Sequence, residues 1–318
     1  MLVSVVIPTY GRSEMLERAI SSVLNQTYKN VEIIIIDDNG LGTVQQKATE
    51  KTLSEYIDKN SIVYVVHEKN AGGCAARNSG IRASNGAYIG FLDDDDEWLP
   101  LFIEKHLEKM QDDADVVYCN YYTTSDSSGK NRLKKYTDNK TGYVFDYLLT
   151  GWCPSTTSMF LVKKECFQKS GYFDESLQSF QDYDMWLTLA REHTFACCEE
   201  YLVVKYQHGF EQLASNPIKR QHALDTLAKK WKILLKESEL EVFEKTIKNF
   251  QKKIYEIEFS KLRNEGLYIK SFKKSVQILK MGNNKIKDVI ELYITLIFGI
   301  KLMPNIRLFK QYIKSKRK

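Results

Sequence analysis

The amino-acid sequence predicts an α/β protein with a mostly parallel central sheet, followed by a basic helical region. Over the first 120 residues, short runs rich in β-branched residues alternate with segments of helical period, and the short runs are apolar throughout. Continuous apolar runs are typical of strands that are covered on both faces. Strands that alternate with helices indicate βαβ units and therefore a parallel sheet.

Five strands are expected in this part of the chain, at Val3–Ile7, Val31–Ile36, Ile62–Val66, Ala87–Leu92 and Asp115–Asn120. Between the first two strands, apolar residues from Met15 to Leu24 fall on one helical stripe, and Ser13 is the expected N-cap. A second helix is expected from Asp182 to about Arg191. The stretch from Thr123 to Thr141 is rich in Ser, Thr, Asp and Lys, which indicates a loop.

Size and composition favour a folded protein without a membrane span. The 318 residues, 43% of them hydrophobic, suffice for one large domain and an appendage. The six cysteines show no CxxC pair or zinc-type spacing, which is typical of reduced thiols in the cytosol. The N-terminus runs directly into a strand, and the longest apolar stretch, Val289 to Met303, contains Glu291 and Lys301. We therefore expect a cytoplasmic protein with neither signal peptide nor transmembrane anchor.

The net charge of +5 is unevenly distributed along the chain. Residues 219–318 hold 25 Lys/Arg against 10 Asp/Glu, which leaves 21 against 31 in residues 1–218. The C-terminal region therefore carries +15 and the body carries −10. Such polarity suggests a basic element that meets an anionic surface or partner, attached to an acidic domain whose site uses a cation with phosphates.

Polar segments follow four of the predicted strands. In an open parallel sheet, ligands bind outside the carboxyl ends of the strands, so these segments are the candidates for a site. They are Pro8-Thr9-Tyr10-Gly11-Arg12, Asp37-Asp38-Asn39-Gly40, the stretch from Asn70 to Asn78, and Asp93-Asp94-Asp95-Asp96.

The run of four aspartates, Asp93 to Asp96, is the most informative of these segments. The carboxylates would repel one another at the edge of a packed sheet, and a divalent cation would relieve that repulsion. Hard oxygen ligands suit Mg²⁺ or Mn²⁺, which typically also hold substrate phosphates. The alternative is a solvated acidic turn that caps a helix starting near Trp98.

The other segments are weaker signals when each is taken alone. Asp38 could accept a hydrogen bond from a base or a ribose, but an acidic pair after a strand is equally typical of a turn. The pair Gly72-Gly73 lets the backbone approach a ligand closely, and Arg77 could meet a base or a diphosphate. An ordinary surface arginine explains Arg77 equally well.

Together these segments resemble family 2 glycosyltransferases of the GT-A fold. The resemblance rests on SVVIPTYGR, VEIIIIDDNG, NAGGCAARNSGI and YIGFLDDDDEWLP, in that order, and on the later stretches SFQDYDMWLTL and VKYQHGFEQLAS. It covers about residues 1–215 and implies a GT-A catalytic domain at 1–217. Residues 1–120 would form its nucleotide-binding half and 121–217 its acceptor-binding half, with a basic helical region at 218–318.

The resemblance also implies a role for individual residues. Those expected to bind the nucleotide sugar are Pro8, Thr9, Tyr10, Arg12, Asp38, Gly72, Arg77, Asp93 and Asp94. Within this set, the first three line the base pocket, Asp38 contacts the base and Asp93 lies near the ribose. Asp95 and His208 are expected on the metal, Mn²⁺ or Mg²⁺, and Asp94 or Asp96 could share that role.

Asp182 matches the family's general base, which removes the proton from the acceptor hydroxyl. The resemblance therefore implies an inverting reaction. The family's usual Glu before this position is Gln181 here, and Asp184 is the competing candidate for the base. Asp182 could instead be an N-cap of its helix. Trp98 and Trp186 could stack on a sugar, although core packing is expected for at least one of them.

The function expected from the resemblance is transfer of a sugar from a UDP-sugar donor to a glycan, lipid-linked or protein-linked acceptor, in assembly of surface polysaccharide such as capsule or cell wall. Its rivals are a catalytically silent carbohydrate-binding or scaffold protein and a sugar nucleotidyltransferase. The basic C-terminal helices could dock on the inner face of an anionic membrane, pack on the catalytic domain or form a homodimer. Nucleic acid is not expected as a partner, because no recognition motif is present.

Overall fold

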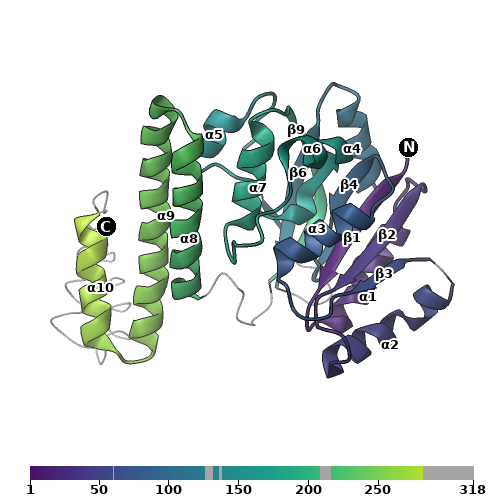
Figure 1. Ribbon diagram of the computed structural model, residues 1–318, viewed down its shortest axis with the longest axis horizontal. Helices are drawn as coiled ribbons and strands as arrows, with labels where there is room; N and C mark the ends of the chain where they lie inside the picture. The colour runs from purple at the N-terminus through teal and green to yellow at the C-terminus, as the bar shows by residue number, and fades with distance from the viewer. Residues whose placement is uncertain (60, 126–131, 136–137, 208–215, 282–318) are drawn as a thin grey trace, which may run out of the picture.

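The computed structural model describes residues 1–59, 61–125, 132–135, 138–207 and 216–281, and one large sheet organises the first two thirds of the chain (Figure 1). The strands are β1 Val3–Thr9, β2 Val31–Asp37, β3 Val63–Val66, β4 Tyr88–Phe91, β5 Asp96–Trp98, β6 Val116–Thr124, β7 Leu133–Lys135, β8 Phe160–Lys163 and β9 Phe195–Tyr206. The helices are α1 Ser13–Leu24, α2 Val44–Asp58, α3 Gly73–Ala83, α4 Phe102–Met110, α5 Phe145–Leu149, α6 Lys164–Ser170, α7 Gln181–Ala190, α8 Pro217–Leu234, α9 Glu237–Asn264 and α10 Tyr268–Lys280, with a 3₁₀ turn, η1, at Thr157–Met159.

The sheet has the order β3-β2-β1-β4-β8-β6-β9-β5, with β7 paired to β6. The pairs β1–β2, β2–β3, β1–β4 and β6–β9 are parallel, whereas β8 runs antiparallel to β4 and β6. The predicted α/β fold with a mostly parallel central sheet is therefore confirmed. Because β4 is flanked by β1 and by β8, its carboxyl end lies between segments that are far apart in the sequence.

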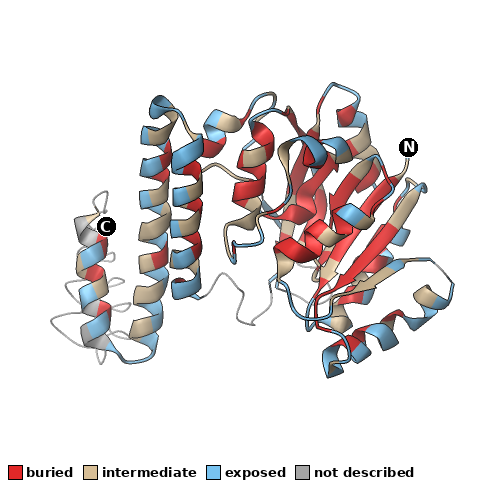
Figure 2. Ribbon diagram, in the orientation of Figure 1, coloured by how far each residue is buried: buried red, intermediate tan, exposed pale blue. Residues whose placement is uncertain are grey.

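Burial explains why the apolar runs become strands. Val3, Val5, Val6 and Ile7 in β1 are fully buried, as are Ile34 to Ile36 in β2, and helices cover these strands (Figure 2). A strand of this kind gains by burying its side chains on both faces, which only a covered parallel sheet allows. The predicted strands of the first 120 residues all appear in the sheet.

Two local predictions were wrong. Ser13 is the first helical residue of α1, and Arg12 occupies the N-cap position, where its side chain does not cap the helix. The stretch Thr123–Thr141 is only partly a loop, because β6 continues to Thr124 and pairs with β7. Leu133, Lys134 and Lys135 are exposed in β7, so backbone pairing rather than an apolar pattern forms this strand.

Both tryptophans that were considered for sugar stacking belong to the core. Trp98 stacks on Phe102 with 3.8 Å between ring centroids, and Trp186 stacks on Phe160 at 3.6 Å. Both indole rings are almost fully buried, so neither presents a face to a ligand. Asp96–Trp98 forms the strand β5 instead of the start of a helix, and α4 begins at Phe102.

The C-terminal helices extend the core of the body outward. In Figure 1, α8 lies between α7 and α9, and α10 lies beyond α9. Buried residues of α8 and α9 belong to the same apolar cluster as the sheet; they are Ala223, Leu224, Leu227, Trp231, Phe243 and Ile254. Among the residues described, no helix has the length and apolar character to cross a membrane.

Candidate functional site

The four aspartates at the carboxyl end of β4 form the centre of a polar site. Asp93 accepts hydrogen bonds from the guanidinium of Arg77 at 2.7 Å and from the Thr156 hydroxyl at 3.1 Å. Burial opposes ionisation of Asp93, but Arg77 outweighs it, so the pKa of Asp93 lies below its usual value. Asp93 is therefore a carboxylate, held in place by charge-assisted hydrogen bonds.

Asp94 and Asp95 face the loop that follows β1. Thr9 donates a hydrogen bond from its hydroxyl to Asp94 at 2.7 Å, and a guanidinium nitrogen of Arg12 lies 2.6 Å from the other Asp94 oxygen. Arg12 also pairs with the Asp95 carboxylate. Burial raises the pKa of Asp94 to about 7, although Arg12 opposes this shift. The β1 loop therefore neutralises part of the acidic cluster.

Asp96 is buried like Asp94, and it accepts a hydrogen bond from the Ser158 hydroxyl at 2.7 Å. Burial, together with the charges of Asp93 and Asp95, raises the pKa of Asp96 well above its usual value. Asp93, Asp95 and Asp96 each offer a carboxylate oxygen, and these oxygens lie within 4.8 Å of one another. Three crowded carboxylate oxygens are a donor set that fits Mg²⁺ or Mn²⁺.

Asp38 organises the loop between β3 and α3. Its two carboxylate oxygens accept hydrogen bonds from the backbone N–H groups of Ala71 and Gly72, both at 2.8 Å, and His67 Nδ1 lies 2.8 Å from the first of them. Gly72 has a φ of +91°, a conformation that favours glycine. Asp38, expected on the base, thus holds the backbone at the start of α3.

The remaining segments that the sequence analysis placed in the base pocket line the same edge of the sheet. Pro8 and Thr9 lie in β1 opposite Ile36 and Asp37 of β2, and Tyr10 is largely exposed just beyond them. The backbone N–H of Gly11 donates to the Asn39 side chain at 2.7 Å, which ties the β1 and β2 loops together. An exposed ring beside a rigid loop is free to stack on a planar ligand.

Arg77 joins the acidic cluster to α7. It is almost fully buried, and its other terminal nitrogen lies 3.4 Å from the Gln181 side-chain oxygen. Although burial disfavours the charged guanidinium, Asp93 and Asp182 raise the pKa of Arg77. Arg77 is therefore a buried cation at the site rather than an ordinary surface arginine.

The two candidates for the general base lie on different sides of α7. Burial and the charge of Asp93 raise the pKa of Asp182, and Arg77 opposes this shift, so Asp182 belongs electrostatically to the acidic cluster. Asp184 is buried instead against α8, where it accepts hydrogen bonds from Lys230 at 2.7 Å and from the Trp231 indole at 2.8 Å. Both Asp184 oxygens are therefore engaged by α8. His208, the other residue expected on the metal, lies outside the described residues.

The sequence matches the family model described as Glycosyl transferase family 2 over residues 4–170, more than half of the chain. The chain belongs to glycosyl transferase family 2. An uncharacterized glycosyltransferase of Methanocaldococcus jannaschii is 33% identical over 239 residues, which cover 73% of this chain and 80% of that protein. The predicted glycosyltransferase class of enzyme is thereby confirmed.

Other members of family 2 are similar over the same part of the chain. The putative colanic acid biosynthesis glycosyl transferase WcaA of Escherichia coli is 30% identical, with 69% of this chain and 77% of WcaA covered. Some relatives are longer, since the chain spans only 31% of an uncharacterized glycosyltransferase of Rickettsia bellii. The crystal structure of Staphylococcus aureus TarS 1–349 in complex with UDP-GlcNAc has a TM-score of 0.60 at 15% identity, covering 88% of this chain and 81% of that one. This likeness confirms the predicted GT-A fold.

Sequence reasoning missed several residues of this family 2 site. Thr156, Thr157 and Ser158 reach the acidic cluster only because β8, which follows them, pairs with β4. Lys205 in β9 lies opposite Asp96 in β5 in the register of these antiparallel strands, and its charge lowers the pKa of Asp93. Neither feature has a local sequence signal, apart from the position of Lys205 within the quoted stretch VKYQHGFEQLAS.

Proposed function

We propose that this family 2 member transfers a sugar from a UDP-sugar to a hydroxyl of a glycan, lipid-linked or protein-linked acceptor, with inversion at the anomeric carbon. The observation that carries the proposal is the position of Asp182. It lies in the first turn of α7, where the charges of Arg77 and of Asp93 in the acidic cluster both act on it, and burial raises its pKa. A carboxylate with a raised pKa beside an acidic cluster that would hold a cation is suited to take the acceptor proton.

Asp95, with Asp93 and Asp96, would hold Mn²⁺ or Mg²⁺, and His208 is proposed as a further ligand. When bound, the cation would neutralise charge that develops on the leaving diphosphate. Arg77 would add a fixed positive charge at the same edge, since it is buried beside Asp93. That a solved neighbour, TarS, was crystallised with UDP-GlcNAc supports a UDP-sugar as the donor.

The decisive experiment is hydrolysis of a panel of nucleotide sugars without acceptor, with Mn²⁺ present and then with a chelator. We expect release of one nucleotide, UDP, in a metal-dependent manner, because water can replace the acceptor hydroxyl. Anomeric configuration of the released sugar, followed by NMR, reports the stereochemistry. Absence of release, together with absence of a thermal shift from every nucleotide, would instead support a silent binding module.

We also propose that the chain acts in the cytoplasm and touches the inner face of an anionic membrane through its basic C-terminal helices, where lipid-linked acceptors reside. Support comes from the charge of +15 on residues 219–318 and from exposed lysines of α10, Lys270 and Lys273. Each basic residue near an anionic surface contributes about 1 kcal/mol at moderate salt. We expect sedimentation with phosphatidylserine vesicles but not with phosphatidylcholine alone.

The charge-reversed variant Lys270→Glu/Lys273→Glu is expected to weaken this sedimentation, and added salt should weaken it further. If the C-terminal helices instead join two copies of the chain, analytical ultracentrifugation should show a stable dimer. In that case vesicle binding would be the same for both lipids, and the membrane proposal would be wrong.

A further inference from the structure

The helix that carries Asp182 begins at a residue in an unusual backbone conformation. Phe180, the N-cap of α7, has φ 61° and ψ 18°, which is the left-handed region. Only two non-glycine residues among those described have a positive φ, Phe180 and Asp113. A side chain with a Cβ adopts this conformation at a cost, so it persists only where the surroundings impose it.

The Phe180 side chain contacts residues of the C-terminal helices. The ring of Phe250 in α9 stacks on the Phe180 ring with 5.3 Å between centroids and 29° between planes. The guanidinium of Arg220 in α8 lies 4.8 Å from the Phe180 ring centroid. The Phe180 ring therefore contacts one aromatic ring and one cation, which come from α9 and α8.

The same two helices also contact the next residues of α7. The Phe250 ring meets Tyr183 edge-on, with 5.2 Å between centroids and 87° between planes. Asp184 accepts hydrogen bonds from Lys230 and Trp231 of α8, as described above. Phe180, Tyr183 and Asp184 thus face the helices α8 and α9, whereas Asp182, in the same turn, interacts with Arg77 and Asp93.

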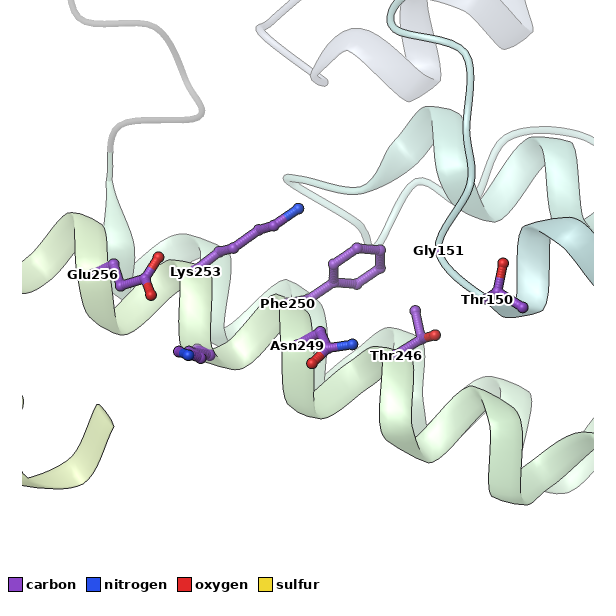
Figure 3. A pocket seen from close by; sticks show the side chains of 8 residues that line it. Thr150, Gly151, Thr246, Asn249, Phe250, Lys253 and Glu256 are labelled. Carbon is purple, nitrogen blue, oxygen red and sulfur yellow. The ribbon is translucent and has the colours of Figure 1, made fainter. Parts of the chain in front are cut away.

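A pocket of about 320 Å³ lies beside this contact, between α9 and the loop after α5 (Figure 3). Phe250 projects from α9 toward that loop, and Thr246 lies close to Gly151. A Cβ on Gly151 would come within 3.0 Å of the Thr246 side chain, so the loop already touches α9 here. The Phe250 ring therefore borders this pocket while it contacts Phe180, and Lys253 Nζ lies 5.9 Å from its centroid.

We propose that the pair α8–α9 positions the general base: Phe250, with Arg220, keeps Phe180 left-handed and so fixes the first turn of α7 and the direction of Asp182. The proposal rests on the proposed function of Asp182. Phe250 and Arg220 are positioning residues, since their rings and charge contact Phe180 and Tyr183 in and before the first turn of α7. The basic C-terminal region is then part of the catalytic apparatus.

The test compares Phe250→Ala with the double variant Phe250→Ala/Phe180→Gly. Without the Phe250 ring, Phe180 should leave the strained conformation, and kcat for nucleotide release should fall about tenfold, with KM for the donor unchanged. Glycine adopts a positive φ at no steric cost, so Phe180→Gly should restore most of the lost kcat. The melting temperature should be lower than that of the wild type in both variants, because glycine does not restore the packing that the Phe250 ring provided.

Phe259→Ala is the matched control, because Phe259 lies on the same helix and its ring packs with Arg263. We expect its kcat to equal that of the wild type. A Phe250→Ala enzyme with wild-type kcat would overturn the proposal. So would a double variant as slow as Phe250→Ala, since the loss would then reflect general destabilisation.

Hydrogen exchange gives a readout that does not depend on turnover. The backbone N–H of Asp184 donates to the Phe180 carbonyl at 2.9 Å, which closes the first turn of α7. Exchange of this amide should become about tenfold faster in Phe250→Ala and return towards the wild-type rate in the double variant. A wild type that releases no nucleotide would contradict the proposed function, while the exchange rates would still decide whether Phe250 holds this turn.

Discussion

Replacement of Asp182 by asparagine is expected to lower kcat for sugar transfer or acceptor-free release by about 10²–10⁴-fold. Asparagine has nearly the same shape and can still accept the backbone hydrogen bond from Thr157, but it cannot take a proton. Nucleotide affinity, measured by calorimetry with UDP, should stay near that of the wild type. The lower kcat would then reflect a slower chemical step rather than weaker nucleotide binding.

The raised pKa of Asp182 also predicts how activity changes with pH. Burial raises the pKa of Asp182, so its carboxylate form is lost at a higher pH than for an ordinary aspartate. Activity of the wild type should fall as the pH drops through that raised pKa. In Asp182→Asn the residual rate should lack this acidic limb.

Asp184→Asn is the matched control, because it makes the same substitution two residues away. Asp184 is 1% exposed and bonds to Lys230 and Trp231, so the variant should lower the free energy of unfolding by about 1–3 kcal/mol. Its kcat should change far less than that of Asp182→Asn. The opposite order of kcat losses would move the base to Asp184.

The sheet could be predicted because the sequence patterns that determine its strands lie within short segments of the chain. Val5, Val6 and Ile34 lie in apolar runs that only a doubly covered strand can bury, and the polar residues that follow mark the ligand edge. The order of the strands brings Thr9, Arg77 and Asp93 to this edge, as the chain pattern implied. Each of these features depends on neighbours within a few residues or on a βαβ unit.

The missed features depend on contacts between distant segments. Trp186 is amphipathic and could serve a site or a core, and only its stacking on Phe160 decides for the core. Asp38 turns toward backbone N–H groups more than 30 residues away, which no local pattern encodes. Phe180, which has a positive φ, likewise stacks on Phe250, 70 residues later in the chain. Such positions are held by tertiary structure against local preference.

The second large effect is expected for Asp95→Ala, which should lower metal-dependent nucleotide release by about 10²–10³-fold. Asp95 offers one of three carboxylate oxygens that lie within 4.8 Å of one another, so its loss leaves an incomplete donor set. Titration with MnCl₂ in the presence of UDP, followed by calorimetry, should give a weaker affinity than for the wild type. Asp112→Ala, an equal charge change at an exposed position beyond α4, should alter neither quantity.

The same cluster should make metal binding depend on pH, because protons and a cation compete for its oxygens. Burial raises the pKa of Asp94 to about 7, and burial together with the charges of Asp93 and Asp95 raises the pKa of Asp96 well above its usual value. Below these values the carboxyl groups are neutral, so Mn²⁺ affinity should fall about tenfold between pH 8 and pH 6. Asp94→Asn removes one titrating group and should flatten this dependence. An affinity that does not change with pH would mean that Asp94 and Asp96 stay ionised, with Arg12 and Lys205 as sufficient counter-charges for the cluster.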